Sequence, residues 1–353
     1  MYLLDFVNAI MFDKTRIPVT RMLSEGALPS RLQRAFYRRR GYRIADDVEF
    51  APGVVIDADE VEIGPGTSIG FGTVIRGRQV RLGRRVTIGS FCFFEGRDMQ
   101  IGDDTVIREQ VFAGGPLFPD STLQVGKRVR IFQSCFLNPS RPLSIGNDTG
   151  VGGRSSIFTH GSWQSAFEGY PVTFEPVTIG HGVWLPWHVF ILPGVTVGDY
   201  ATIGAGSVVN RSIPAGALAA GVPAKILRNS DEWPRPIEPA EQWRLARSVF
   251  AALLAHLEAN DVPADVIETE ARNIARIKYD GRIWQLALTR DGSDAPPTED
   301  IVIQLDGLPT DVDGLMWFAL LEKTRGGTRH PVAEEVADFL ARYGVRFEPY
   351  DEQ

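Results

Sequence analysis

The sequence predicts a mainly β protein in which a parallel β-helix follows a helical segment and precedes a small α+β domain. The main observation is a phrase that occurs seven times: a branched aliphatic residue, then glycine, then a small or β-branched residue four places after the aliphatic. Its aliphatic residues are Ile63, Leu82, Ile101, Val125, Ile145, Ile179 and Val197. A second observation is a six-residue step of aliphatic residues, as from Ile63 to Ile69 and Ile75. Three such steps make one triangular coil with an aliphatic side chain per side pointing to the axis, and successive coils stack.

The glycine of each phrase suits a corner of the coil, because glycine lets the backbone turn tightly without a side-chain penalty. Stacked coils rise by the ordinary interstrand distance of about 4.8 Å, so each coil pairs its backbone with the next. The phrases are spaced by 19, 19, 24, 20, 34 and 18 residues, and spacings above 18 indicate loops that leave a corner. We expect a small loop at residues 114–120 and a long one at residues 161–176.

The limits of the repeat divide the chain into three regions. We expect a helical, partly basic segment at residues 1–47, the β-helix at residues 48–228 and the α+β domain at residues 229–353. A proline-rich joint with Pro234, Pro236 and Pro239 follows the β-helix. The joint indicates where the second domain begins.

The last region alternates helical and strand patterns. The predicted elements are helices at residues 243–257 and 331–343, a hairpin at residues 276–288, and strands at residues 300–305, 316–321 and 345–347. The hairpin turns on Asp280-Gly281, and Gly344 stops the second helix. No residue pattern in this domain is typical of catalysis, and its role stays open between an acceptor contact and a subunit contact.

Composition narrows the class of protein. The 353 residues, 44% of them hydrophobic, are enough for a large core, and a net charge of −7 argues against a nucleic-acid binder. Cys92 and Cys135 each follow the aliphatic residue of their coil by ten places. They should therefore stack two coils apart, about 10 Å by strand spacing, which is too far for a disulfide. We interpret both as small core residues in a reducing compartment and expect a cytoplasmic protein.

The N-terminal region has no basic start, no small-residue cleavage site and no apolar run of 18 residues, so we expect neither a signal peptide nor a membrane span. Aliphatic residues at helical spacing predict an amphipathic helix within residues 3–11. A basic cluster then consists of Arg31, Arg34, Arg38, Arg39, Arg40 and Arg43. It fits a solvated helix packed on the first coil. It also fits a patch for anionic lipid, or for the diphosphate of a lipid-linked glycan, at the inner face of the cell membrane.

The stretch from residue 177 to residue 227 contains the series ILPGV, IGAGSVV and GVPAK. This series resembles the closing coils of the hexapeptide-repeat acyltransferases, and in particular of their sugar and polysaccharide O-acetyltransferases. The resemblance covers residues 48–228, about half of the chain. It implies a left-handed coil, acetyl-CoA as the acyl donor with no metal, a homotrimer with sites between neighbouring coils, and O-acetylation of a sugar in a surface polysaccharide or its precursor.

His160 follows Thr159 at the end of a coil, where the long loop opens. In the family, a histidine at this point is the general base that removes the proton of the acceptor hydroxyl, so the resemblance implies this catalytic role for His160. A hydroxyl is a poor nucleophile at neutral pH, and imidazole titrates near ~6.5, where base strength and availability balance. The expected mechanism is direct transfer, with backbone amides near the loop stabilising the oxyanion.

Three further residues are candidates for binding the acceptor or orienting the base. Asn138 precedes His160 by one coil, near where relatives place an asparagine that contacts the acceptor, although it would also fit as a buried corner cap. Glu168 in the long loop could orient the imidazole or be solvated. Trp163, with Phe167 and Tyr170, could offer flat faces to a sugar ring or pack the loop on a neighbouring coil.

The resemblance places the donor along the coils after the loop. Gly204, Ala205 and Gly206 supply a small surface for pantetheine, and Arg211 and Lys225 stand where the family carries cations for phosphates. One stretch departs from the family pattern, because Pro186, Trp187 and His188 follow Trp184-Leu185 where relatives have glycine and small residues. Trp187 therefore either borders the donor channel and alters it, or caps a pocket for the acyl chain or acceptor.

Two other function classes stay open. A carbonic-anhydrase-like zinc enzyme shares this coil but needs three convergent histidines, usually from two subunits, and the coil holds His160, His181 and His188 at spacings that do not match that family. A catalytically inactive β-helix scaffold is the other alternative.

Overall fold

The computed structural model describes residues 18–259, 264–268, 273–291, 300–308, 315–327 and 330–347. The chain divides into two compact units, Met1–Arg235 and Pro236–Gln353. The expected amphipathic helix within residues 3–11 lies outside the described residues. Among the helices in the described ranges, none is long and apolar enough to cross a membrane.

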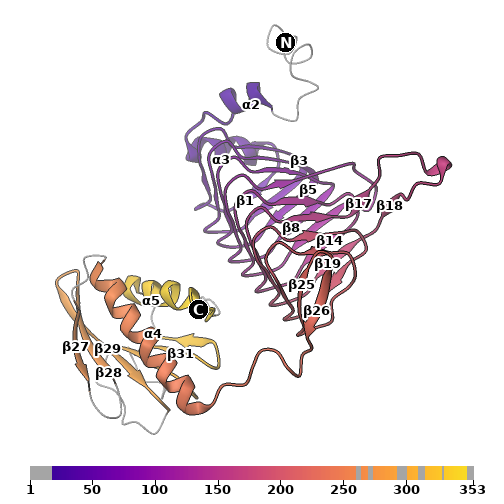
Figure 1. The fold of residues 1–353 in the computed structure, drawn as a ribbon. Helices are drawn as coiled ribbons and strands as arrows, with labels where there is room; N and C mark the ends of the chain where they lie inside the picture. The colour runs from indigo at the N-terminus through magenta and orange to yellow at the C-terminus, as the bar shows by residue number, and fades with distance from the viewer. Residues whose placement is uncertain are drawn as a thin grey trace. The chain divides into compact units, whose positions relative to one another are not determined.

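The first unit is a triangular coil of short parallel strands with three faces (Figure 1). Face a contains β1 (Arg43–Ile44), β8 (Asp98–Ile101), β11 (Thr122–Val125), β14 (Leu143–Ile145), β19 (Val177–Ile179) and β22 (Thr196–Val197). Face b contains β2 (Glu49–Phe50), β4 (Ser68–Ile69), β6 (Thr87–Ile88), β9 (Val106–Ile107), β12 (Arg130–Ile131), β15 (Gly150–Val151), β20 (Trp184–Leu185), β23 (Thr202–Ile203), β25 (Leu218–Gly221) and the antiparallel β26 (Ala224–Arg228). Face c contains β7 (Phe93–Glu95), β10 (Phe112–Ala113), β13 (Phe136–Asn138), β16 (Ser156–Phe158), β21 (Phe190–Ile191) and β24 (Val208–Val209). In the early coils β3 (Val55–Ile63) and β5 (Val74–Leu82) run through faces c and a without a break.

The register of the strands stacks the aliphatic residues of the repeat. Ile69 pairs with Ile88, and Ile145 pairs with Ile179, each on the next coil. These side chains are almost fully buried and form one continuous core along the axis. The aliphatic residues of the six-residue period, together with buried corner residues such as Thr67 and Val86, therefore form the inside of the coil, and most of the remaining side chains face outside.

Three corners join the faces, and we number them along the chain. The first corner joins face a to face b, the second joins b to c, and the third joins c to a. At the first and second corners one residue per coil has a positive φ, and its N–H donates to the carbonyl of the coil before, as from His188 to Gly153 over 3.1 Å. Glycine or a non-glycine residue occupies this position in different coils.

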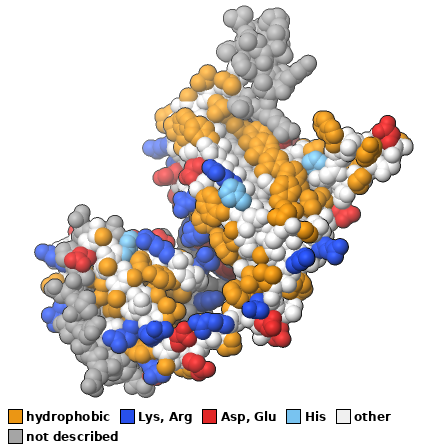
Figure 2. Space-filling model, in the orientation of Figure 1, with side chains coloured by type: hydrophobic (Ala, Val, Ile, Leu, Met, Phe, Trp, Pro, Cys, Tyr) orange, Lys and Arg blue, Asp and Glu red, His pale blue; other side chains and the backbone are white. Residues whose placement is uncertain are grey.

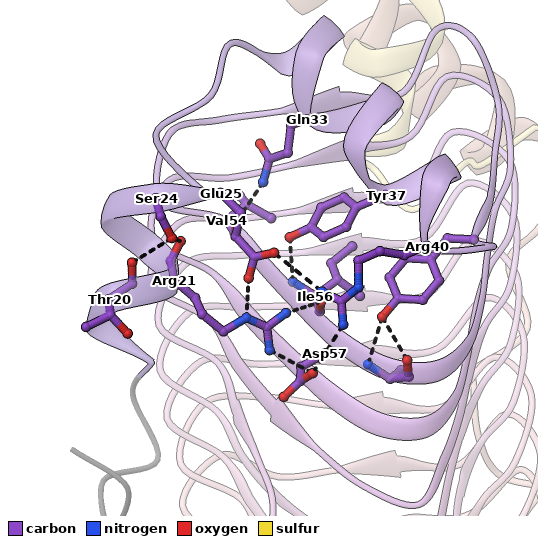
Figure 3. Close-up of polar contacts among 12 residues, drawn as sticks. Thr20, Arg21, Ser24, Glu25, Gln33, Tyr37, Arg40, Val54, Ile56 and Asp57 are labelled. Atoms are coloured by element: carbon purple, nitrogen blue, oxygen red, sulfur yellow. Dashed lines mark hydrogen bonds and ion pairs between the residues drawn. The ribbon is translucent and has the colours of Figure 1, made fainter. Parts of the chain in front are cut away.

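Two helices, α2 (Val19–Ser24) and α3 (Ser30–Arg39), cover the N-terminal end of the coil, where the first strands would otherwise expose unpaired backbone (Figure 3). The hydroxyl of the fully buried Tyr37 accepts from the N–H of Ile56 over 2.9 Å, and Gln33 Nε2 donates to the carbonyl of Val54 over 2.7 Å. Burial raises the pKa of Tyr37 to about 12. Arg21 connects Glu25 with Asp57 on the first coil.

Most of the basic cluster is engaged within the molecule. Arg34 donates to the carbonyl of Val48, Arg38 pairs with Asp46 over 2.7 Å, Arg40 lies 3.5 Å from Glu25, and Arg43 pairs with Glu62 over 2.7 Å. Arg31 and Arg39 are exposed and contact no residue that the structure describes. Contacts within the first unit therefore account for four of these six arginines, two on α3, one at its C-terminal end and one on β1.

Both predicted loops are confirmed. The small one lies between β10 and β11, and the long one contains a short antiparallel pair, β17 (His160–Gly161) with β18 (Thr173–Phe174), around the 3₁₀ turn η2 (Ala166–Glu168). The long loop projects from the coil (Figure 1). Cys92 and Cys135 are free and buried, and the pairing of Phe93 with Phe112 and of Phe112 with Phe136 places them two coils apart, as predicted.

In its described residues, the second unit packs two helices on a six-stranded mixed sheet. The helices are α4 (Pro239–Ala259) and α5 (Pro331–Ala341), and the strands are β27 (Ala264–Glu268), β28 (Asn273–Tyr279), β29 (Arg282–Thr289), β30 (Ile301–Gln304), β31 (Met316–Ala319) and β32 (Thr324–Gly326). The two helices, the hairpin and the strands at 300–305 and 316–321 are confirmed, whereas β27 and β32 were not predicted. The predicted strand at 345–347 is wrong, because this segment does not pair and Phe347 instead packs in the core, 5.1 Å from the ring of Phe318.

Candidate functional site

The third corner brings His160 next to Asn138 of the preceding coil. His160 Nδ1 lies 2.6 Å from Asn138 Oδ1 and 3.4 Å from Ser140 Oγ. Asn138 is almost fully buried, while His160 is half-buried at the start of the long loop. The strands β13 and β16 position both residues, because Asn138 ends one strand and His160 follows the next by two residues.

The hydrogen bonds around Asn138 determine which ring nitrogen of His160 carries the proton. Asn138 Nδ2 donates to the carbonyl of Gly114 over 2.9 Å, and a carbonyl oxygen can only accept. The amide oxygen of Asn138 must therefore face His160, and since this oxygen can only accept, Nδ1 of His160 donates to it. Nε2 is then the unprotonated nitrogen, and it has no hydrogen-bond partner within the described ranges.

The neighbours of Asn138 hold it in this orientation. Thr159 Oγ1 donates to the Asn138 carbonyl over 2.7 Å and accepts from the N–H of Arg141 over 2.9 Å. Gly115 lies against the amide, because a Cβ added there would be 2.0 Å from Asn138 Nδ2. A side chain at this position of the small loop would therefore displace Asn138.

Aromatic rings enclose the imidazole on the loop side. Phe174 on β18 is paired in register with His160, and its ring stacks on the imidazole with centroids 5.6 Å apart and planes 12° apart. The ring of Phe118, from the small loop, lies 5.0 Å from Phe174. Burial among these groups lowers the pKa of His160 from its ordinary value, because it penalises the charged form. The ring is consequently neutral at neutral pH.

The other loop candidates lie away from the imidazole in this chain. Glu168 is exposed in η2, and its carboxylate makes no hydrogen bond with His160 or with any other described residue, so it is Asn138 that contacts Nδ1 of the imidazole. Trp163 and Phe167 are fully exposed, at 97% and 103%. Tyr170 is 45% exposed. These rings have no aromatic partner among the described residues.

Sequence reasoning missed three residues around His160. Ser140 and Phe174 touch or stack on the imidazole, and Glu175 lies over the next coil, where a Cβ added to Gly194 would be 2.1 Å from its carboxylate. The sequence feature that could have indicated Phe174 is its position at the end of the long loop, where the chain returns to the coil. Without the register of the β17–β18 pair, that position does not reveal which residue meets the histidine.

The expected donor residues occupy two corners. Trp187, Gly204, Ala205 and Gly206 lie at the second corner on successive coils, where the N–H of Gly206 donates to the carbonyl of Trp187 over 3.0 Å. Lys225 on β26 pairs with Ala220, which is adjacent to Ala219, the acceptor of the Gly204 N–H. Arg211 follows β24 at the third corner, on the side of His160. Within one chain, Arg211 is therefore separated from the other donor candidates.

The three histidines of the zinc alternative lie at three different corners. His181 is at the first corner, where its Nδ1 accepts from the N–H of Asn147 over 3.0 Å, His188 is at the second and His160 at the third. No group of three or more His, Cys, Asp or Glu side chains in the described part of the chain could hold a metal ion. Within one chain the coil thus separates the three histidines, and a zinc site of this kind would need histidines from two subunits to converge.

A stripe of stacked phenylalanine rings runs along face c toward His160. Phe93, Phe112, Phe136, Phe158 and Phe190 stack in sequence with centroids 5.1 Å apart. All five are half-buried, and Figure 2 shows a continuous stripe of hydrophobic side chains along the coil. Ser156 leaves room in the stripe for the ring of Phe158, which is two residues further along the same strand. The centroid of the Phe158 ring lies 6.2 Å from that of the His160 imidazole.

Comparison with known proteins agrees with this geometry. Residues 176–211 match the family model "Bacterial transferase hexapeptide (six repeats)". The "putative colanic acid biosynthesis acetyltransferase WcaF" of Escherichia coli K12 is 32% identical over 133 residues, which cover 38% of this chain and 70% of WcaF. The chain belongs to the hexapeptide-repeat acetyltransferase family. The expected left-handed parallel β-helix is therefore confirmed as its fold class.

Other relatives of this hexapeptide-repeat protein match over shorter or less similar stretches. Galactoside O-acetyltransferase of E. coli K12 is 51% identical over 57 residues, which are 16% of this chain and 28% of the enzyme. The chain thus spans less than a third of that relative. A crystal structure of a hexapeptide-repeat acetyltransferase from Vibrio cholerae with acetyl coenzyme A is 20% identical, with a TM-score of 0.32, and the match covers 63% of this chain and 91% of that one.

Proposed function

We propose that this protein transfers an acetyl group from acetyl-CoA to a hydroxyl of a sugar, in a surface polysaccharide or its precursor, with His160 as the general base. The observation that carries the proposal is the 2.6 Å contact of His160 Nδ1 with an Asn138 amide whose orientation is fixed by Gly114. It leaves Nε2 of a neutral imidazole as a proton acceptor at the mouth of the long loop. The acetyltransferase family supplies the reaction class.

The proposed step is a direct transfer. The acceptor hydroxyl attacks the thioester carbonyl as His160 Nε2 takes its proton, a C–O bond forms, and the C–S bond breaks to release coenzyme A. The proton on the imidazolium then passes to the leaving sulfur or to water. Asn138 holds Nδ1–H throughout, and the Phe174 ring keeps the imidazole plane in place and limits water on that side.

We propose a homotrimer with the site between neighbouring coils. Support comes from the aromatic stripe on face c, since a row of half-buried rings beside the base is typical of a surface that packs on another subunit. A second subunit would also supply the donor residues of the second corner, which in one chain lie on a different corner from His160. Sedimentation of the full chain as a monomer at micromolar concentration would contradict this arrangement.

The test combines binding and turnover in the full-length protein. Calorimetric titration with acetyl-CoA should give saturable binding, and thiol release from acetyl-CoA in the presence of a panel of neutral and acidic oligosaccharides should reveal an acceptor. His160→Ala should keep donor binding and lose thiol release. Thiol release that His160→Ala leaves unchanged would refute the base assignment, and a folded trimer that does not bind acetyl-CoA would refute the donor.

A further inference from the structure

The second corner carries two basic side chains that have no hydrogen-bond or ion-pair partner among the described residues. Arg154 and His188 occupy its positive-φ position on consecutive coils, with φ values of 57° and 63°. Both side chains are exposed and form no hydrogen bond or ion pair with a described residue. Neither belongs to the site proposed above, which uses His160 at the third corner and the donor residues listed for the second.

The first corner shows how an arginine at the equivalent position is held when its role is structural. There, Arg85 Nε lies 2.6 Å from Asp104, and Arg128 Nε lies 2.7 Å from Asp148, each aspartate being on the next coil. At the second corner, the residue on the coil after Arg154 is a histidine, and the residue on the coil before is Ser134. Ser134 Oγ is itself 3.2 Å from Gln110 Oε1.

The carboxylate nearest along this corner is Glu109, which is two coils before Arg154, about 10 Å by strand spacing. It makes no ion pair with Arg154. Within the described ranges, no carboxylate therefore neutralises the charge of Arg154, in contrast to its two counterparts at the first corner.

A flat aromatic surface adjoins these side chains. The Trp187 ring fills the space over Gly153, since a Cβ there would lie 2.4 Å from the ring, and Trp187 is 39% exposed. On the other side of His188, Gly206 leaves open space, because nothing lies within 4 Å of a Cβ added to it. The exposed indole, the guanidinium and the imidazole thus lie on neighbouring coils, next to the open space at Gly206.

We propose that this corner binds an anionic group of a ligand whose ring packs on Trp187, with Arg154 and His188 holding the anion. A guanidinium pairs with phosphate or carboxylate through two parallel hydrogen bonds, and an indole face packs against a planar base or a sugar ring. The same chemistry suits the phosphates and adenine of the acyl donor and an acidic sugar of the acceptor. The inference rests on the proposed function, because that function supplies the two candidate ligands, the acyl donor and the acceptor. Its new part is that the bound ligand carries a negative charge at this corner.

Binding experiments on the full-length protein separate the two sources. The probes are adenosine 3′,5′-bisphosphate with adenosine as its neutral counterpart, and a tetrasaccharide of alternating glucuronic acid and N-acetylglucosamine with neutral chitotetraose as its counterpart. Calorimetry should show that one anionic probe binds and that Arg154→Gln weakens it about tenfold, the effect of losing one charge-assisted contact. His188→Gln should weaken it less, and raising the salt concentration should reduce the wild-type affinity.

The control is Arg39→Gln, which removes the same charge from an exposed arginine on α3 that has no described partner. It should leave the affinity unchanged, and the melting temperature of Arg154→Gln should equal that of the wild type because the side chain makes no contact. If Arg154→Gln weakens binding of the bisphosphate, the corner belongs to the donor site. If it weakens binding of the acidic tetrasaccharide, the corner belongs to the acceptor site. If neither anionic probe binds, or if Arg154→Gln binds both as well as the wild type, the proposal is wrong. Because no acetyl transfer is measured, these outcomes are independent of the role of His160.

Discussion

Two regions of the coil have similar backbone but different side-chain chemistry. One is the first corner, and the other is the side that runs from the second corner to the third. On the first corner, arginine and aspartate alternate along the stack and neutralise one another, as in Arg128 with Asp148. On the other side, polar groups stay open toward solvent: Nε2 of His160 at the third corner and the guanidinium of Arg154 at the second. Because the buried aliphatic residues and the backbone pairing between coils hold the whole coil together, one side can add ion pairs while the other carries chemistry.

The largest expected effect tests the third corner. His160→Ala should lower kcat by about 10²–10⁴-fold, the usual contribution of a general base. The melting temperature should fall only slightly, because the half-buried ring gives up one hydrogen bond, to Asn138, and its stacking on Phe174. Steady-state thiol release and thermal unfolding measure the two quantities. If the variant lost activity only because it unfolds or dissociates, its melting temperature would fall strongly or its sedimentation coefficient would decrease.

The second prediction concerns the orientation of the base by Asn138. Asn138→Asp replaces an amide by a carboxylate facing Nδ1, which favours the imidazolium and raises the pKa of His160. In the wild type, burial lowers that pKa, so kcat/KM should fall with decreasing pH only below about 6.5, as the neutral base is lost. In Asn138→Asp this acid limb should move to higher pH. A pH–rate profile with the same midpoint in both proteins would contradict the contact as the determinant of the tautomer.

A third prediction tests the packing of the second corner. Gly153→Ala places a Cβ where the Trp187 ring lies, so the indole must move, at a cost of about 1–3 kcal/mol in the free energy of unfolding. The tryptophan emission should shift as the ring becomes more exposed. Denaturant unfolding gives the free energy, and Gly161→Ala, whose added Cβ would meet nothing within 4 Å, is the matched control. Equal stability of the two variants would show that Trp187 relaxes without cost.

The smallest effect distinguishes the corners directly. Arg128→Gln breaks the pair with Asp148, whose side chains are 20% and 38% exposed, and should lower the free energy of unfolding by about 0.5–1 kcal/mol. Arg154→Gln breaks no contact and should leave it unchanged. Both variants fold, so the difference in their urea midpoints measures the first corner alone. A loss of stability in Arg154→Gln as large as in Arg128→Gln would remove the contrast on which the comparison depends.

Much of this arrangement follows from the sequence. The six-residue period determined the coil, its buried aliphatic residues, the free cysteines and both loops, because burial of a repeated side chain forces the same backbone path each time. The position of His160 at the opening of the long loop, the small residues of the last coils and the resemblance to the family were equally readable, since each depends on residues close together along the chain.

Only the tertiary structure decided which groups meet. Asn138 and His160 touch because one coil stacks on the next, and Phe174 reaches the imidazole because the long loop folds back as an antiparallel pair. The segment 345–347 has a strand-like pattern but serves as core packing, since the ring of Phe347 finds Phe318 and its backbone finds no strand to pair with. Arg154 and Arg128 have similar corner positions in the sequence, and only the residue stacked on the next coil, histidine or aspartate, makes one open and the other paired. The repeat encodes the path of the chain, whereas the contacts between coils depend on residues that pair across 16 to 34 positions and are set by the register of the stack.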